Sequence, residues 1–127
     1  MYKRQIYIIP TSLAVTKAAV LQVKGKLPGV KSLHKMVTGE DRSIWRDHRG
    51  HLGTGFDRLE GYVFYSTLYQ KSPELIENEI NFAGGQQGYP SNELDQVFRK
   101  IAWRAVIENP LSGVVDSNGD GIGDLVE

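Results

Sequence analysis

The sequence contains no cysteine, which excludes a disulfide, a thiolate zinc site and a cysteine nucleophile. Long hydrophobic runs are also missing: apolar stretches such as residues 6–9 and 13–15 are far shorter than the roughly 20 residues of a membrane-spanning helix. We therefore predict no membrane span, and no signal-peptide pattern is visible in these residues. With 127 residues, of which 40% are hydrophobic, the chain can form one folded domain or part of a larger one.

The chain has no excess of charge of either sign, since its formal net charge is zero. The charges are unevenly placed, with 11 Lys and Arg against 4 Asp and Glu in residues 1–58, and 4 against 11 in residues 59–127. The two halves can attract each other in the fold, or form a basic face and an acidic end. Because the basic residues are scattered rather than grouped with aromatic side chains, we predict no nucleic-acid partner.

The hydrophobic pattern predicts an α/β chain that is mostly helical, with one clear strand and at least three helices. The strand is expected at residues 6–9, and residues 28–54 are expected to form a long loop, a type of segment that often carries function. A lone strand needs partners, so we expect a sheet that extends beyond these residues. Helices are expected at residues 13–24, 58–70 (buried on nearly all sides) and 74–80, and from Ser91 to Asn109, with a flexible break at residues 84–88. The predicted N-cap residues are Thr11, Ser12, Asp57, Ser72 and Ser91, and Tyr62, Tyr65 and Trp103 are expected to be core residues.

The C-terminal twelve residues match the calcium-loop pattern, with oxygen-bearing side chains at loop positions 1, 3, 5 and 9, glycine at 6 and glutamate at 12. Calcium takes six to eight oxygen ligands, and alternate side chains around a sharp turn converge on one point. Position 8 is Gly123 and no exiting helix follows, so a disordered Gly/Asp-rich tail is the alternative. The expected metal ligands are Asp116, Asn118, Asp120, the Ile122 carbonyl, Asp124 and Glu127, with calcium as a structural cofactor.

The second candidate site is the run Arg46-Asp47-His48-Arg49-Gly50-His51-Leu52-Gly53 in the predicted loop. An imidazole whose tautomer is fixed by a carboxylate is the base half of a nucleophile, base and acid triad, and His51 and Asp47 are close enough in sequence to meet. Histidines that only meet solvent or cap the next helix are the alternative. A metal site at Asp47, His48 and His51 needs a fourth ligand, and the one other histidine is His34. The other carboxylates near in sequence are Asp41 and Asp57.

Several segments between residues 6 and 73, taken in their order along the chain, resemble the C-terminal part of an SGNH/GDSL-type hydrolase, a flavodoxin-like α/β family of esterases. The resemblance implies that the chain forms the C-terminal part of a three-layer α/β/α domain. The acidic end also resembles the calcium repeats of dockerins and thrombospondin type 3 arrays. The pieces that resemble the hydrolase family are residues 6–10 with the helix that follows, 25–29, 47–52, 61–68 and 72–73, and residues 101–114 resemble the closing helix of some bacterial members.

In that family an Asp-x-x-His motif supplies the catalytic base, so the resemblance implies that His51 is the base and Asp47 its orienting carboxylate. The spacing here is Asp-x-x-x-His, which is one residue longer. The family's nucleophilic serine, in a Gly-Asp-Ser block, and its oxyanion Gly and Asn have no match in this chain. We therefore predict a fragment of a serine-dependent hydrolase of carbohydrate or other small-molecule esters, inactive alone and extracellular or periplasmic in the full-length protein.

The expected organisation is a partial α/β domain over residues 1–110, followed by an acidic calcium-loop connector over residues 111–127. Residues 1–5 resemble translated read-through sequence rather than a natural start of the protein. Two other functions stay open. The chain can be a calcium-binding structural or interaction module, or a degenerate α/β domain without catalysis. Loss of helical structure on chelation would favour the calcium module. Hydrolysis by the full-length protein that survives removal of the His51 imidazole would favour the degenerate domain.

Overall fold

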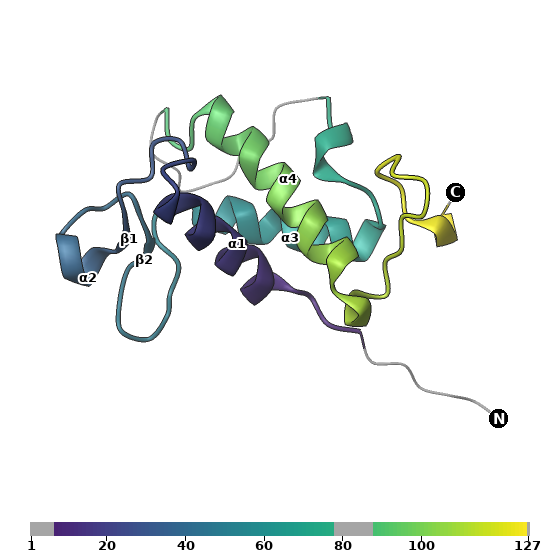
Figure 1. Cartoon of the computed structure of the whole chain (residues 1–127), viewed down its shortest axis with the longest axis horizontal. Helices are drawn as coiled ribbons and strands as arrows, with labels where there is room; N and C mark the ends of the chain where they lie inside the picture. The colour runs from purple at the N-terminus through teal and green to yellow at the C-terminus, as the bar shows by residue number, and fades with distance from the viewer. Residues whose placement is uncertain (1–6, 78–87, 127) are drawn as a thin grey trace.

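The computed structural model of the protein describes residues 7–77 and 88–126. They form an α/β fold that is mostly helical, in which three long helices pack beside a small two-stranded parallel sheet (Figure 1). No helix in these ranges is long and apolar enough to cross a membrane. The elements are α1 Thr11–Val23, β1 Ser32–His34, α2 Lys35–Thr38, β2 Ser43–Trp45, α3 Phe56–Tyr69 and α4 Asn92–Glu108, with 3₁₀ helices η1 Pro73–Leu75, η2 Pro110–Ser112 and η3 Asp124–Val126.

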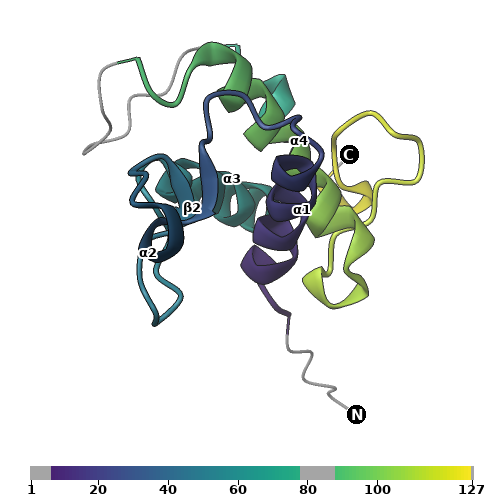
Figure 2. The same cartoon turned by 60° about the vertical axis from the view of Figure 1, so that its left-hand side comes forward.

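The hydrophobic core lies where α1, α3 and α4 meet (Figures 1 and 2). The rings of Phe56 on α3 and Phe98 on α4 pack edge to face, with their centroids 5.0 Å apart. The helix predicted after Ser91 is confirmed as α4, and the Ser91 hydroxyl caps it by accepting a hydrogen bond from the Leu94 amide. The buried apolar residues of α4, apart from Trp103 on another face, follow its 3.6-residue period: Leu94, Phe98, Ile101, Ala102, Ala105 and Val106.

The helix predicted at residues 58–70 is confirmed as α3, but its start and burial differ from the prediction. It begins at Phe56 after Gly55, which adopts a left-handed φ of +88°, so Asp57 lies in the first turn instead of capping it. The side chain of Phe56 is fully buried, and this burial draws the start of the helix into the core. The prediction of burial on nearly all sides is wrong, because Phe64 and Leu68 are exposed.

The N-terminal strand predicted at residues 6–9 is absent from the described part of the segment, residues 7–9. These residues make no strand ladder, and the Ile8 amide donates one hydrogen bond to the Leu111 carbonyl. Pro10 is the N-cap of α1, and Thr11 is already the first helical residue. Thr11 and Ser12 therefore do not cap this helix as predicted. Ile6 lies outside the described residues.

The loop predicted at residues 28–54 instead contains both strands of the sheet and the short helix α2. β1 and β2 pair in parallel, with Ser32 opposite Ser43 and His34 opposite Trp45. The hydroxyls of Ser32 and Ser43 lie 2.5 Å apart and are buried. The Ser43 hydroxyl also donates to the Glu40 carbonyl at 2.6 Å, and the Ser32 hydroxyl accepts from the Thr38 hydroxyl at 2.7 Å, so both buried hydroxyls have partners. This pair therefore needs no apolar side chains, and the sequence shows no strand pattern there.

The described part of the segment after α3 contains less helix than predicted. In the described part of the helix expected at residues 74–80, residues 74–77, the one helical element is η1, and Ser72 caps it as predicted by accepting a hydrogen bond from the Glu74 amide at 3.1 Å. Residues 78–80 and the predicted break at 84–87 lie outside the described residues. Of the three aromatic residues expected in the core, Tyr62 and Trp103 are buried, whereas Tyr65 is partly exposed and packs against Tyr69.

Candidate functional site

The loop that carries His51 closes back on β2. The Arg46 amide donates to the His51 carbonyl at 2.9 Å, and Trp45 and Leu52 form an isolated antiparallel bridge. At Gly53 the chain passes so close to β2 that an added Cβ atom would lie 1.9 Å from the Ser43 carbonyl oxygen. Only glycine allows this approach, and it fixes the position of the loop at the edge of the sheet.

Asp47 and His51 form a close pair inside this loop. The Asp47 Oδ2 atom and the His51 Nδ1 atom are 2.5 Å apart. The other carboxylate oxygen, Oδ1, accepts hydrogen bonds from the backbone amides of Arg49 at 2.9 Å and of His51 at 3.1 Å. The carboxylate therefore holds both the ring and the backbone of His51. The longer Asp-x-x-x-His spacing brings the two side chains together, because the loop is folded around Asp47.

The other carboxylates considered from the sequence have different surroundings. Asp41 forms an ion pair with Lys35 at 2.7 Å. Asp57 lies in the first turn of α3 and borders a pocket next to His51. Within residues 7–77 and 88–126, the Asp47 carboxylate is the one acidic group in contact with the His51 ring, and no hydrogen bond joins His51 to a serine hydroxyl.

The contact with His51 changes the acidity of Asp47. The hydrogen bond from the His51 side chain, helped by the backbone amides of His51 and Arg49, lowers the pKa of Asp47 from 3.8 to about 2. Because the pKa of Asp47 in the folded chain lies below its ordinary value of 3.8, this contact contributes its full stability at pH values above 3.8. That contribution is lost as the pH falls through the folded-state pKa of about 2.

We expect ¹³C NMR of the Asp47 carboxyl carbon to report a pKa of about 2 in the wild-type chain and a return toward 3.8 in His51→Ala. His48→Ala is the matched control, because this histidine lies in the same loop and is exposed without contacting Asp47. The control should leave the pKa of Asp47 at its wild-type value. An Asp47 pKa near 3.8 in the wild-type chain would contradict the contact.

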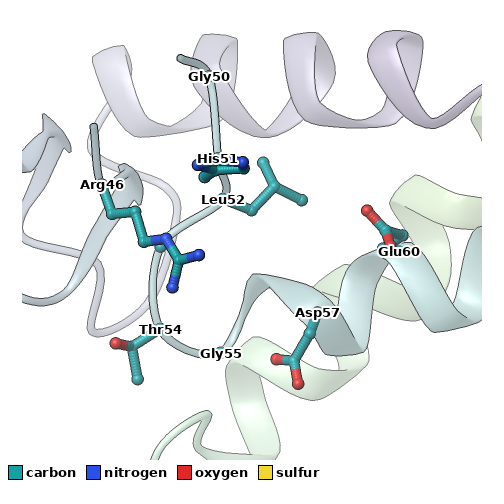
Figure 3. Close-up of a pocket in the computed structure, with 9 residues that line it drawn as sticks. Arg46, Gly50, His51, Leu52, Thr54, Gly55, Asp57 and Glu60 are labelled. Atoms are coloured by element: carbon teal, nitrogen blue, oxygen red, sulfur yellow. The ribbon is translucent and has the colours of Figure 1, made fainter. Parts of the chain in front are cut away.

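His51 lies on the wall of a pocket of about 470 Å³ between its loop and the start of α3 (Figure 3). The His51 side chain is 54% exposed, so its ring is accessible from solvent. Asp57 and Glu60 from α3 form the opposite wall, and neither makes an ion pair within residues 7–77 and 88–126. The lining residues are Arg46, Gly50, His51, Leu52, Gly53, Thr54, Gly55, Asp57 and Glu60.

Five of the nine lining residues lie in the predicted run of residues 46–53, and Asp57 was predicted as a nearby carboxylate. The sequence did not indicate Thr54, Gly55 or Glu60 as site residues. Glu60 lies three residues after Asp57, so the two share one face of α3. No pattern indicated that this face meets the histidine loop, because that contact depends on how α3 packs against α1 and α4 in the folded chain.

The transition-metal site considered at Asp47, His48 and His51 is not assembled. His48 faces His34 instead, with the ring centroids 6.3 Å apart, and the His34 Nδ1 atom accepts a hydrogen bond from the Met36 amide. In the parts of the chain that the structure describes, no group of three or more His, Asp or Glu side chains lies close enough to hold a metal ion.

The first half of the predicted calcium loop forms a tight turn around Asp116. The Asp116 carboxylate accepts hydrogen bonds from the amides of Gly119, Asp120 and Gly121 at 2.9–3.2 Å. Asn118 Oδ1 accepts from the Asp120 amide, and Gly121 adopts the left-handed φ of +83° that its loop position needs. Asp116, Asn118 and Asp120 are thus brought into one turn.

The second half of this loop is arranged differently. The two oxygens of the Asp124 carboxylate accept hydrogen bonds from the backbone amide and the hydroxyl of Ser117. Both hydrogen bonds lower the pKa of Asp124, and the bond from the Ser117 hydroxyl has the larger effect. The Ile122 residue forms an antiparallel bridge with Lys71. Glu127, the predicted ligand at position 12, lies outside the described residues.

The calcium-loop segment is attached to the segment that follows α3. The amide of Ser72 donates to the Gly121 carbonyl, and the amide of Gly123 donates to the Gln70 carbonyl, each at 2.7 Å. These bonds flank the bridge between Lys71 and Ile122. Residues 120–124 therefore pack against the fold rather than forming a free tail.

Comparison with known proteins adds no identity: no family model, no curated protein and no solved structure matches this chain.

Proposed function

We propose that this chain supplies the general base of a serine-dependent ester hydrolase, as part of a flavodoxin-like domain of the SGNH/GDSL type. His51 is the base, and Asp47 is the carboxylate that orients it. The observation that carries the proposal is the 2.5 Å contact between Asp47 Oδ2 and His51 Nδ1 on the wall of an open pocket.

The contact suits the base role because it leaves the other ring nitrogen, Nε2, for the reaction. Within the described residues, Nε2 of His51 has no hydrogen-bond partner. A proton on Nδ1 shared with Asp47 makes Nε2 the basic nitrogen, which takes the proton from a serine hydroxyl as the serine attacks an ester carbonyl. The Asp47 carboxylate then stabilises the imidazolium, and His51 returns the proton to the leaving alcohol.

The pocket supports a polar ester as the substrate. Arg46, Asp57 and Glu60 place one cation and two carboxylates around it, and such groups bind hydroxyls through charge-assisted hydrogen bonds. This lining suits the alcohol part of a carbohydrate or another small polar ester. The nucleophilic serine and the oxyanion donors belong to the motifs that the family carries before its histidine motif.

Aryl-ester hydrolysis by the longer reading frame tests the proposal. The DNA that precedes codon 1 is translated in frame, the encoded polypeptide is expressed together with residues 1–127, and p-nitrophenyl acetate is the substrate. The proposal expects an upstream Gly-Asp-Ser block and hydrolysis that depends on His51. An open frame without such a block, or hydrolysis that survives His51→Ala, would overturn it, and the second outcome favours a non-catalytic α/β domain.

The C-terminal loop supports calcium binding as a second function. Its favourable feature is the turn around Asp116, in which three backbone amides hold one carboxylate while Asn118 and Asp120 share the turn. Asp116, Asn118, Asp120, the Ile122 carbonyl, Asp124 and Glu127 would hold the ion. Calcium would tie the loop to the segment after α3, as a structural ion with no part in hydrolysis. Extracellular modules bind calcium at about 10⁻⁴–10⁻³ M, so this role fits an exported protein.

Calcium is expected to raise the melting temperature of the chain, because an ion that binds only the folded state stabilises it. At 100 times its dissociation constant the gain is about 2.7 kcal/mol. Differential scanning fluorimetry with calcium, magnesium and a chelator measures the shift. Asp116→Asn should remove the response to calcium, and Glu93→Gln, an exposed acid on α4, should keep it. An equal shift with magnesium, or with the Asp116 variant, would contradict a calcium site.

A further inference from the structure

A second hollow lies in the groove between α1 and α4. These two helices run side by side (Figures 1 and 2). The volume of the hollow is about 470 Å³, within the range of about 300–1,000 Å³ typical of small-molecule sites. None of its residues takes part in the Asp47 and His51 site. The lining residues are Thr16, Lys17, Val20, Leu21, Lys100, Ile101, Arg104 and Glu108.

The floor of this α1–α4 groove is apolar. Val20 and Leu21 come from α1, and Ile101 comes from α4. Ile101 is almost buried, but Val20 keeps 47% of its surface exposed although it lies in the groove. The two helices thus leave a strip of apolar surface between them without covering it. Such a strip favours an occupant with a hydrocarbon part.

The rim of the groove is positively charged on the α4 side. Lys100 and Arg104 lie one helical turn apart, so both reach the same stretch of the groove. In residues 7–77 and 88–126, neither makes an ion pair, whereas Lys17 is neutralised by its ion pair with Glu108. Lys100 and Arg104 also border a neighbouring hollow lined by Glu74 and Asp116, but neither of these carboxylates is within ion-pair distance.

The size of the groove argues against a protein partner. A stable protein interface uses about 20–30 residues on each side, whereas eight residues line this groove. A narrow apolar strip with two cations at one side instead matches a molecule with one alkyl chain and one anionic group. We propose that the α1–α4 groove binds a long-chain carboxylate, with the alkyl chain over Val20, Leu21 and Ile101 and the carboxylate at Lys100 and Arg104.

Isothermal titration calorimetry with octanoate, decanoate and dodecanoate, each below its micelle concentration, tests this site in the full chain. Affinity is expected to rise with chain length, because each added methylene buries more apolar surface. Arg104→Gln should weaken dodecanoate binding about tenfold or more, since it removes a charge-assisted hydrogen bond. Lys26→Gln is the matched control, as an exposed cation outside the groove, and should leave binding unchanged.

A second variant and a second ligand separate this site from general adsorption of detergent. Val20→Ser shortens the apolar floor at a half-exposed position, so the helix should still fold, and circular dichroism checks this. It should weaken dodecanoate more than octanoate. Dodecyltrimethylammonium has the same chain with the opposite charge and should bind at least tenfold more weakly. Equal binding of the two surfactants would overturn the proposal, as would sedimentation that shows a dimer of the wild-type chain but not of Val20→Ser.

Discussion

Replacing Asp95 with alanine is expected to lower the free energy of unfolding by about 3–5 kcal/mol. Asp95 joins α3, α4 and the segment at η1 through a buried network. Its carboxylate accepts hydrogen bonds from the Tyr62 hydroxyl at 2.6 Å and from Arg99 Nε at 2.8 Å. Arg99 in turn donates to the carbonyls of Pro73 and Ile76. Without Asp95, the Arg99 guanidinium stays buried at 5% exposure and loses the anion that compensates its charge.

The same network changes the acidity of Tyr62. Burial, followed by the hydrogen bond to Asp95, raises the pKa of Tyr62 to about 12. Tyr62 therefore stays a neutral donor to the carboxylate over the usual pH range. Arg58 also reaches the Asp95 carboxylate at 3.3 Å, so three side chains depend on one acidic group.

Urea unfolding followed by circular dichroism at pH 7 measures this loss, by linear extrapolation to water. Glu93→Ala is the matched control, because Glu93 is an exposed acid in the same first turn of α4, and should cost less than about 1 kcal/mol. Removing both Asp95 and Arg99 should cost less than the sum of the single losses, because the buried Arg99 guanidinium that Asp95 neutralises is then gone as well. A loss below about 1 kcal/mol for Asp95→Ala would show that water compensates Arg99, so that the network does not hold these segments together.

The helices could be predicted from the sequence because their signals are local and repeated. In α4, apolar residues recur at helical spacing over four turns, and Ser91 precedes them as a cap. The start of α3 could not be predicted in the same way. Asp57 has the better capping side chain, but the burial of Phe56 against Phe98 extends the helix back to Gly55. Tertiary packing there outweighs the local preference for a capping residue.

The sheet could not be predicted because its strands are short and make their best contacts with each other. Three residues give no period, and the first pair of the ladder is Ser32 with Ser43, whose hydroxyls are buried and hydrogen-bonded. The single segment with a strand-like composition, residues 6–9, makes no ladder in its described part. A β-branched run indicates a strand only when a partner edge lies beside it.

The pairing within the candidate site could be predicted only in part. Sequence spacing left Asp41, Asp47 and Asp57 as possible partners of His51. The choice of Asp47 depends on its backbone hydrogen bonds to Arg49 and His51, which fold the loop around the carboxylate. Side chains of Asp and Asn often organise short loops in this way. The opposite wall of the pocket comes from α3, and its approach to the loop is a property of the packed fold.

In the longer polypeptide that the proposed function requires, His51→Ala is expected to lower kcat/KM for p-nitrophenyl acetate by about 10²–10⁴-fold, the range that a positioned general base contributes. Asp47→Asn should also lower kcat, because the amide can no longer hold the proton on Nδ1 and leave Nε2 basic. His48→Ala should stay within about twofold of the wild type, since His48 faces His34 and does not touch Asp47.

The double variant with both Asp47→Asn and His51→Ala carries the sharpest test of the pair. Asp47 acts on the reaction only through His51, so once the imidazole is gone, the second substitution has nothing left to remove. The double variant should therefore be no slower than His51→Ala, as is found for catalytic groups that act as a unit. Losses that multiply would show that Asp47 contributes independently of His51. The 2.5 Å contact would then be a loop-stabilising bond rather than half of a catalytic triad.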